Sequence, residues 1–225
     1  IWSLSIQIGN TQTPTAILDS VTSVYTNAIA YTDSGKVNRV FDGGYGFREV
    51  LGFFATKYVK QPLSFSFEYR SVSKLGDPID DLTISGDTIA NLIYFRNGNL
   101  LNQDSMEMEY ALSLGVAGSG GLTLLIPNIL SIPNWSTGVL SIQDKVQRLE
   151  DEVYREQSCY RLRLKIIIKR QPGSGDNSRL SSEVQHEQTI WIAKKNYSII
   201  RMDQKAIYKN SKLSESIAFF PKIEN

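Results

Sequence analysis

The sequence predicts an α+β protein built on an antiparallel β-sheet, with a helix near its start and a second helical segment between two sets of strands. Long runs alternate apolar and polar residues, which is the period of a strand with one buried face. Two segments depart from that period, one with helical spacing and one that is apolar and almost uncharged. Turn residues such as Asn97-Gly98 separate neighbouring runs. Together these observations favour hairpin-connected strands with a partial helical cover.

Composition describes an ordinary globular chain and excludes several classes of partner. The 225 residues are 41% hydrophobic and 21% charged, which suits one core, so we expect a single domain over residues 1–225. Lysine and arginine total 24 against 23 acidic residues, so no broad positive field exists to bind nucleic acid. Charges or prolines interrupt the longest apolar stretches well below the roughly 20 residues of a transmembrane helix. We therefore expect no nucleic-acid partner and no transmembrane segment.

The first element is a predicted amphipathic helix over residues 15–29. Apolar side chains recur there at three- and four-residue spacing, and Thr15 is the expected N-cap. The pattern changes to period two from Tyr31 onward, which marks the beginning of the strands.

Residues 47–72 are predicted to form two adjacent antiparallel strands. After Pro62 the apolar residues alternate strictly with polar ones, so one face of the second strand is expected to be buried and the other wet. The residues expected to face the interior are Leu63, Phe65, Phe67 and Tyr69, and those expected to face water are Ser64, Ser66, Glu68 and Arg70.

A hairpin and a helical insertion follow. Residues 89–96 and 99–108 flank Asn97-Gly98, a dipeptide that accepts positive φ at both positions and so forms a tight turn. Residues 110–132 then carry almost no charge and include glycines at positions 115, 118, 120 and 121. We expect this segment to contain helix, to lie on the apolar face of the sheet and to act as a mobile lid.

The second set of strands is predicted over residues 147–158, 160–168 and 189–201, with a turn near Lys194-Lys195-Asn196. The intervening polar residues 171–182 are expected to form an exposed loop. Arg161, Arg163 and Lys165 are expected on the wet side of the sheet, with contact to lipid headgroups as the alternative.

Three local patterns resemble the LolA/LolB-like periplasmic lipoprotein-carrier superfamily. The first joins YTDSG at 31–35 to the strand pair FATKYVKQPLSFSFE at 54–68. The second is the small-residue run LGVAGSGG at 114–121, and the third is the pair of late strands with SCYRL at 158–162 and TIWIAKK at 189–195. The order of elements is also similar to that superfamily, and the resemblance covers most of residues 15–205.

The resemblance implies a LolA-like fold, an open and strongly curved antiparallel sheet, or incomplete β-barrel, covered by helices. It also implies an exported, noncatalytic protein, periplasmic or associated with the outer membrane, whose apolar cavity accepts a lipid, an acyl chain or a lipoprotein. Gln61 departs from the pattern, because the carrier itself has an arginine before the strand proline that helps to hold the lid. The expected cavity-lining residues are Phe54, Leu63, Phe65, Phe67, Tyr69, Leu122, Leu124, Leu125 and Trp191.

The residues offer little support for catalysis, a metal or a cofactor. His186 is the only histidine, and no Gly-X-Ser-X-Gly element presents a serine nucleophile. Cys159 is the only cysteine and is expected to be a buried apolar residue, which excludes a multi-cysteine metal cluster; with one histidine and one cysteine in all, we do not expect a zinc site. The pair Asp80-Asp81 and the run at 150–152 are expected at solvated turns and strand ends. We predict no catalytic residue, no metal and no cofactor.

Two other functions remain open. An envelope structural or protein-interaction module would have its core filled by its own side chains, and an enzyme would have a polar cleft around His186. Because the chain begins with Ile1 rather than Met, we also expect that an export signal preceded it.

Overall fold

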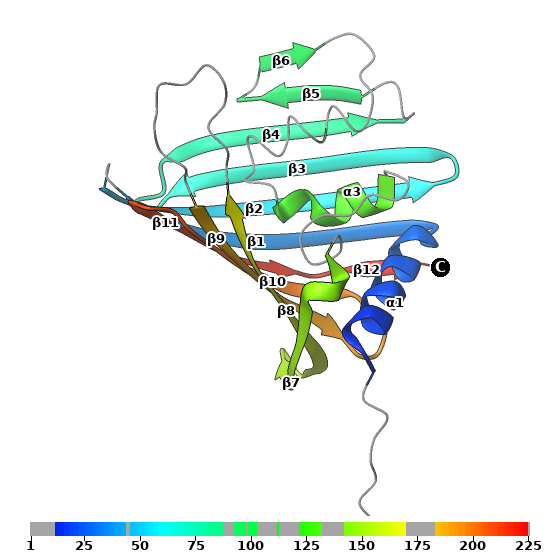
Figure 1. Cartoon of the computed structure of the whole chain (residues 1–225). Helices are drawn as coiled ribbons and strands as arrows, with labels where there is room; N and C mark the ends of the chain where they lie inside the picture. Colours follow the sequence, from blue (N-terminus) through cyan, green and yellow to red (C-terminus); the bar gives the residue numbers. More distant parts are fainter. Residues whose placement is uncertain are drawn as a thin grey trace, which may run out of the picture.

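A twelve-stranded antiparallel sheet with helices on one side forms the protein (Figure 1). The computed structural model describes residues 12–43, 46–87, 92–97, 99–102, 112, 122–131, 142–169 and 183–224. The strands are β1 (Ala30–Gly43), β2 (Gly46–Lys60), β3 (Leu63–Ser73), β4 (Pro78–Gly86), β5 (Leu92–Arg96), β6 (Asn99–Asn102), β7 (Val146–Tyr154), β8 (Gln157–Lys169), β9 (Glu183–Ala193), β10 (Ile199–Ile207), β11 (Ser211–Phe219) and β12 (Lys222–Glu224). The helical elements are α1 (Pro14–Thr26), η1 (Leu122–Leu124), α3 (Leu125–Ser131) and η3 (Gln143–Lys145).

The sheet is open rather than closed. Its strand order is β6-β5-β4-β3-β2-β1-β11-β10-β9-β8-β7, with β12 also paired to β1, and β6 and β7 are the edges within the described residues. Figure 1 shows the later strands β7–β11 running steeply across the direction of β1–β4, so the sheet bends strongly around its helical side. The predicted class, an α+β protein with an open, curved antiparallel sheet and a helical cover, is confirmed.

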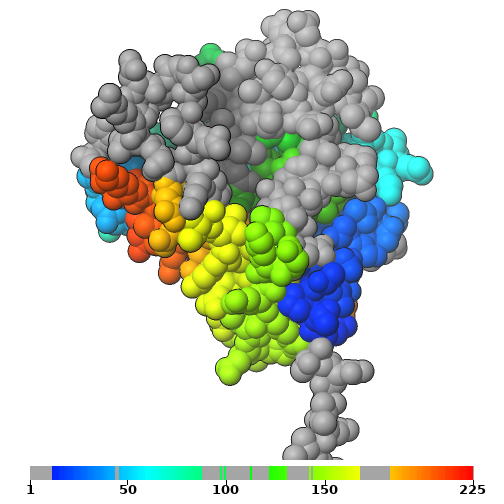
Figure 2. Space-filling view, in the orientation of Figure 1, coloured from blue at the N-terminus to red at the C-terminus, as the bar shows by residue number. Residues whose placement is uncertain are grey.

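Helix α1 begins at a proline that follows a capping threonine. The Thr13 side chain accepts a hydrogen bond of 3.2 Å from the backbone nitrogen of Ala16, which satisfies one of the free amides of the first turn. Pro14 suits the first helical position, where no intrahelical donor is needed. The expectation of Thr15 as the cap is wrong, because Thr13 is the N-cap and Thr15 is already the second residue of the helix. Figure 2 shows α1 packed beside the η3–β7 segment at the narrow end of the molecule.

The predicted strand pair over residues 47–72 is confirmed. β2 and β3 pair antiparallel, with Thr56 opposite Phe67 and Phe54 opposite Tyr69. Phe65, Phe67 and Tyr69 are buried, while Leu63 at the strand end is half-buried. On the other face Ser64, Glu68 and Arg70 are exposed and Ser66 is half-buried.

The turns are partly as predicted. Asn97 has a φ of 51° between β5 and β6, which confirms the hairpin, although Gly98 lies outside the described residues. The chain also reverses after Ala193, and Tyr197 has a φ of 55° before β10. The single strand expected over residues 147–158 is wrong: Arg155 and Glu156, with φ values of 50° and 63°, form a tight turn that divides it into β7 and β8. Neither is a residue type that favours positive φ, so the composition gave no signal for this turn.

The helical insertion lies against the inner face of the sheet. Its described part includes η1 and α3, and residues 122–130 are all buried. Figure 1 shows α3 on the same side of the sheet as α1, and residues of the two helices lie close together. The glycines at 115, 118, 120 and 121 lie outside the described residues, so movement of this segment as a lid stays a prediction.

Candidate functional site

The inner face of the curved sheet gathers eight of the nine residues predicted to line a cavity. These residues come from β2, β3, η1 and α3, and they belong to or pack against one apolar cluster: Phe54, Leu63, Phe65, Phe67, Tyr69, Leu122, Leu124 and Leu125. Their burial follows from strand alternation on one side and from the helical cover on the other. Segments up to about 70 residues apart thus meet in one buried apolar cluster, and a ligand cavity lined by these residues stays a prediction.

Trp191 lies elsewhere. Its neighbours Ile190 and Ile192 face the inner cluster, so alternation along β9 directs Trp191 to the outer face. There it joins a small separate cluster with Cys159, which is buried as predicted. The indole nitrogen of Trp191 donates a hydrogen bond of 3.3 Å to the Glu152 carboxylate, and the ring does not line the inner face.

Two further parts of the inner surface were not predicted from the sequence. Helix α1 contributes Tyr25, whose ring meets that of Tyr31 edge to face at 5.7 Å and whose hydroxyl accepts a hydrogen bond from the backbone nitrogen of Ile199. Strand β11 pairs with β1 and so lies in the middle of the sheet. Its alternating residues Leu213, Glu215, Ile217 and Phe219 were a signal for an inner-facing strand that the prediction did not use.

A row of polar side chains crosses the inner face on four neighbouring strands. In register, Arg39 of β1 is opposite Glu215 of β11, Glu215 is opposite Gln204 of β10, and Gln204 is opposite Gln188 of β9. We call these four residues the polar belt. Within the polar belt, Arg39 Nη2 and Glu215 Oε1 form an ion pair of 2.8 Å. Gln188 Nε2 donates a hydrogen bond of 2.9 Å to Gln204 Oε1. Burial raises the pKa of the Glu215 carboxyl, while the guanidinium of Arg39 opposes that rise.

A hollow of about 280 Å³ adjoins the polar belt. Its walls are both apolar and polar, and they consist of Arg39, Phe41, Arg48, Val50, Ser71, Ile79, Asp80 and Leu213. Phe41 and Leu213 face each other across β1 and β11, two residues beyond the Arg39–Glu215 pair. The hollow thus places an apolar wall next to two arginines.

Asp80 was expected at a solvated turn or strand end, and this is wrong. The residue is 8% exposed and lies opposite Ser71, where the β3–β4 register shifts by a bulge. A bulge re-aims the side chains beside it. Its neighbour Asp81 is exposed, as expected.

His186 also lies on the inner side, away from any described carboxylate partner. It is opposite Ile166 of β8 and Ala206 of β10. Burial lowers the pKa of His186, and a hydrogen bond with Gln204 opposes this effect. An amide does not orient a histidine as a general base in the way that a triad carboxylate does.

Asp33 places a carboxyl group inside the apolar cluster. It is 7% exposed, and the Tyr31 hydroxyl donates a hydrogen bond of 2.8 Å to its Oδ2. Burial raises the pKa of Asp33 from 3.8 to about 6, because the ionised form loses its hydration. The folded protein therefore holds this proton more tightly than the unfolded chain does, and the contribution of Asp33 to stability falls as the pH rises from about 4 to about 6.

We expect Asp33→Asn to stabilise the protein at pH 8 but not at pH 4. The variant avoids a buried anion, and a displacement of the pKa by about two units corresponds to about 2–3 kcal/mol. Urea unfolding of both proteins at the two pH values measures the difference. The same stability change at pH 4 and pH 8 would contradict a raised pKa.

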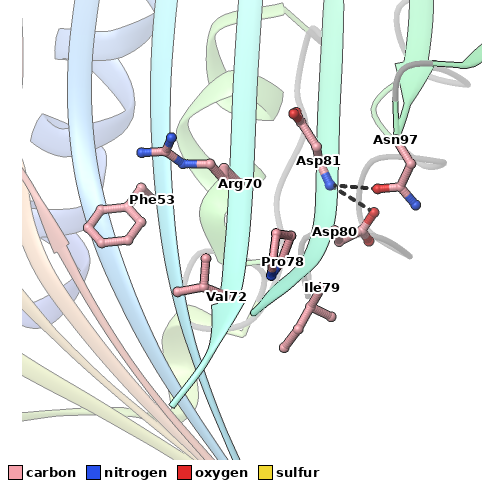
Figure 3. Close-up of a pocket in the computed structure, with 8 residues that line it drawn as sticks. All are labelled: Phe53, Arg70, Val72, Pro78, Ile79, Asp80, Asp81 and Asn97. Atoms are coloured by element: carbon pink, nitrogen blue, oxygen red, sulfur yellow. Dashed lines mark hydrogen bonds between the residues drawn. The ribbon is translucent and has the colours of Figure 1, made fainter. Parts of the chain in front are cut away.

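A second hollow lies on the outer face of the sheet, away from the helices (Figure 3). It has a volume of about 670 Å³ and is lined by Phe53, Arg70, Val72, Pro78, Ile79, Asp80, Asp81 and Asn97. Two cations lie near the Phe53 ring: the guanidinium of Arg70 is 5.7 Å and the ammonium of Lys36 is 5.9 Å from the ring centroid. Figure 3 shows the backbone nitrogen of Asp81 donating to the side chains of Asp80, at 3.1 Å, and Asn97, at 3.0 Å. Because its walls mix both charges with apolar groups, this hollow differs from the predicted acyl-chain cavity.

Two general features of the described residues bear on the site. No three His, Cys, Asp or Glu side chains among them gather closely enough to hold a metal ion. None of the described helices is long and apolar enough to span a membrane.

Comparison with known proteins finds likenesses in structure only. No family model matches the sequence, and no curated protein matches it. The lipoprotein LppX of Mycobacterium tuberculosis is similar at 13% identity and a TM-score of 0.40, over 91% of this chain and 93% of the other. LprF of Mycobacterium bovis is similar at 10% identity and a TM-score of 0.40, over 91% of both chains.

A third similar structure is a LolA superfamily protein of Nitrosomonas europaea, at 7% identity and a TM-score of 0.27, over 96% of this chain and 95% of the other. At such identities and TM-scores these likenesses say nothing of a ligand or partner of this chain. The LolA superfamily is nevertheless the group that the sequence itself resembles.

Proposed function

We propose that this protein is an exported, noncatalytic binding protein of the cell envelope, and that it holds a lipid or acyl chain against the inner face of its curved sheet. One observation carries the proposal: a single apolar surface extends over the inner face and is covered by α1, η1 and α3 rather than by a second sheet. The helical cover is held to the sheet by side-chain packing and by single hydrogen bonds, such as the one from the Ile199 backbone nitrogen to the Tyr25 hydroxyl, rather than by a ladder of strand hydrogen bonds. It therefore separates from the sheet at a lower cost than a strand would.

The hollow beside the polar belt supports an amphipathic ligand with an acidic group. Phe41, Val50 and Leu213 supply an apolar wall, and Arg48 has no ion-pair partner among the described residues. A carboxylate or phosphate at Arg48 would leave the attached chain next to the apolar wall. A fatty acid is thus a suitable probe.

The energetics allow useful affinity. Each buried methylene contributes about 0.8 kcal/mol, so ten of them contribute about 8 kcal/mol before the ligand and the cover are ordered. Binding in the micromolar range corresponds to about 8 kcal/mol. Micromolar binding therefore requires that opening the helical cover costs little free energy.

A protein-interaction module with a filled core is the second candidate. It is favoured by the close burial of the predicted lining residues, since Phe65, Phe67 and Tyr69 are each no more than 2% exposed. In this alternative the inner face provides stability alone, and a partner contacts the outside.

Binding of a fluorescent long-chain fatty acid distinguishes the two candidates. We expect the native protein to bind the probe, and we expect Leu213→Asp to weaken binding at least about tenfold, because it places a charge on the apolar wall. The matched control is Leu51→Asp, which makes the same change at a leucine that is 38% exposed on the outer face of β2. Circular dichroism confirms that both variants fold.

Two results would count against the proposal. Equal binding by the native protein and Leu213→Asp means that the probe does not occupy the inner face. No binding by the native protein favours the interaction module.

A further inference from the structure

Three arginines and three aromatic rings alternate along the outer side of the late strands. Starting at one end, the order is Phe220, Arg155, Tyr154, Arg201, Trp191 and Arg161, and we call this set the arginine–aromatic stack. The guanidinium carbon of Arg155 lies 4.0 Å from the ring centroid of Phe220. That of Arg201 lies 4.5 Å from the ring centroid of Trp191. Such contacts fix the plane of a guanidinium group and leave its N–H edge available for hydrogen bonds.

Carboxylates neutralise two of the three arginines. Arg161 forms an ion pair of 2.8 Å with Glu152, and Arg201 forms one of 2.8 Å with Asp203. Arg155, at the end of the stack, has no ion-pair partner within the described part of the chain. Its position is nevertheless set by Phe220 and by Tyr154, whose ring centroid is 5.1 Å away.

Arg155 lines a pocket of about 260 Å³ where three chain connections meet. The pocket lies between the β7–β8 turn, the β9–β10 turn and the segment that joins β11 to β12. Its lining residues are Arg155, Gln157, Asn196, Ser198, Ile200, Phe219, Phe220, Pro221 and Lys222. Of these described residues the two charged ones are both cations, and no carboxylate is among them.

The polar side chains of the β9–β10 turn are held in place. The Asn196 Oδ1 atom accepts hydrogen bonds of 3.2 Å from the Ser198 backbone nitrogen and 2.9 Å from the Ser198 hydroxyl. Since its oxygen is engaged within the turn, the amide nitrogen of Asn196 is the group that Asn196 offers to a ligand. The pocket thus combines a fixed guanidinium, an ammonium and a neutral donor.

From this arrangement we infer that the pocket is a binding site for a phosphate group. A fixed guanidinium edge suits two oxygens of a phosphate, and a nearby lysine adds a second positive charge. Phe220, 47% exposed at the rim, provides an apolar contact for whatever carries the phosphate. The group belongs either to a soluble phosphate compound or to a phospholipid headgroup at a membrane surface. This site is separate from the inner face and does not depend on the function proposed above.

The test has a soluble arm and a membrane arm. Inorganic phosphate is titrated into the ¹⁵N-labelled full chain, and chemical-shift changes are followed by NMR. Vesicles of phosphatidylcholine with and without phosphatidylglycerol are then used in co-sedimentation. The two pocket variants are Arg155→Gln and Lys222→Gln. Lys222 is not part of the arginine–aromatic stack, so weaker binding by Lys222→Gln cannot result from disruption of the stack. The matched control is Lys212→Gln, which removes an exposed charge near the opposite end of β11.

We expect phosphate to shift signals of residues 155, 196–198 and 220–222, and each pocket variant to weaken binding about tenfold. The control should bind as the native protein does. If the pocket variants, but not the control, also lose sedimentation with phosphatidylglycerol vesicles, the phosphate belongs to a lipid headgroup. If phosphate binds at the pocket but no vesicle does, it belongs to a soluble compound.

Two outcomes would overturn the inference. One is the absence of phosphate-dependent shifts at the pocket in low-salt buffer. The other is equal weakening by Lys212→Gln and by the pocket variants, because that shows attraction to net charge rather than to a site.

Discussion

Replacing Arg39 with methionine is expected to lower the free energy of unfolding by about 3–5 kcal/mol. The side chain of Glu215 is 0% exposed and that of Arg39 is 19% exposed, so the variant leaves a buried carboxylate without its cation. Removing one partner of a buried pair is far more costly than removing both. Urea unfolding at pH 7 measures the change.

A double variant and a surface variant make this prediction specific. Arg39→Met combined with Glu215→Leu should recover most of the lost stability, because no buried charge remains. Lys74→Met breaks an ion pair of 3.2 Å with Glu49 whose lysine side chain is 74% exposed, and it should change stability by less than about 0.5 kcal/mol. Equal losses for Arg39→Met and Lys74→Met would contradict a buried role for the polar belt.

Gly35→Ala is expected to cost about 2–3 kcal/mol. On the inner face of β1 the ring of Phe54 packs directly over Gly35, so a methyl group there would overlap the ring. The added carbon would also lie 2.6 Å from the backbone oxygen of Ala218 on β11, which cannot move without disturbing the sheet. An aromatic ring over a strand glycine is a recurrent way to cover a strongly bent sheet.

The neighbouring position supplies the control for this prediction. Ser34 is exposed on the opposite face of β1, so Ser34→Ala should change stability by less than about 0.5 kcal/mol. Thermal unfolding of the two variants gives the comparison. A Gly35→Ala protein as stable as Ser34→Ala would show that the Phe54 ring has room to move aside.

Strict alternation allowed the sequence to predict the strands whose two faces differ. Between Leu63 and Arg70 every second residue is apolar, and a shift of one residue would bury polar groups. Register and buried face therefore followed from the pattern alone. The same reasoning placed α1, whose apolar residues share one side.

Where consecutive residues are all apolar, the alternation pattern could not determine which of them point to the inner face of the sheet. Ile190, Trp191 and Ile192 form such a run, and either register buries large groups. The face of Trp191 is fixed by its neighbours, because Arg161 and Arg201 lie opposite it on β8 and β10. These contacts exist only after three strands pair.

The sequence by itself determined the class of fold, the inner face of β3 and the apolar character of the helical insertion, since each depends on local periodicity. Only the tertiary structure decided the polar belt and the pocket lined by Arg155. Arg39 and Glu215 are 176 residues apart, and the pocket needs three separate connections to meet. Their proximity results from strand order, with β11 inserted beside β1, and long-range pairing of this kind is not encoded in any short stretch of residues.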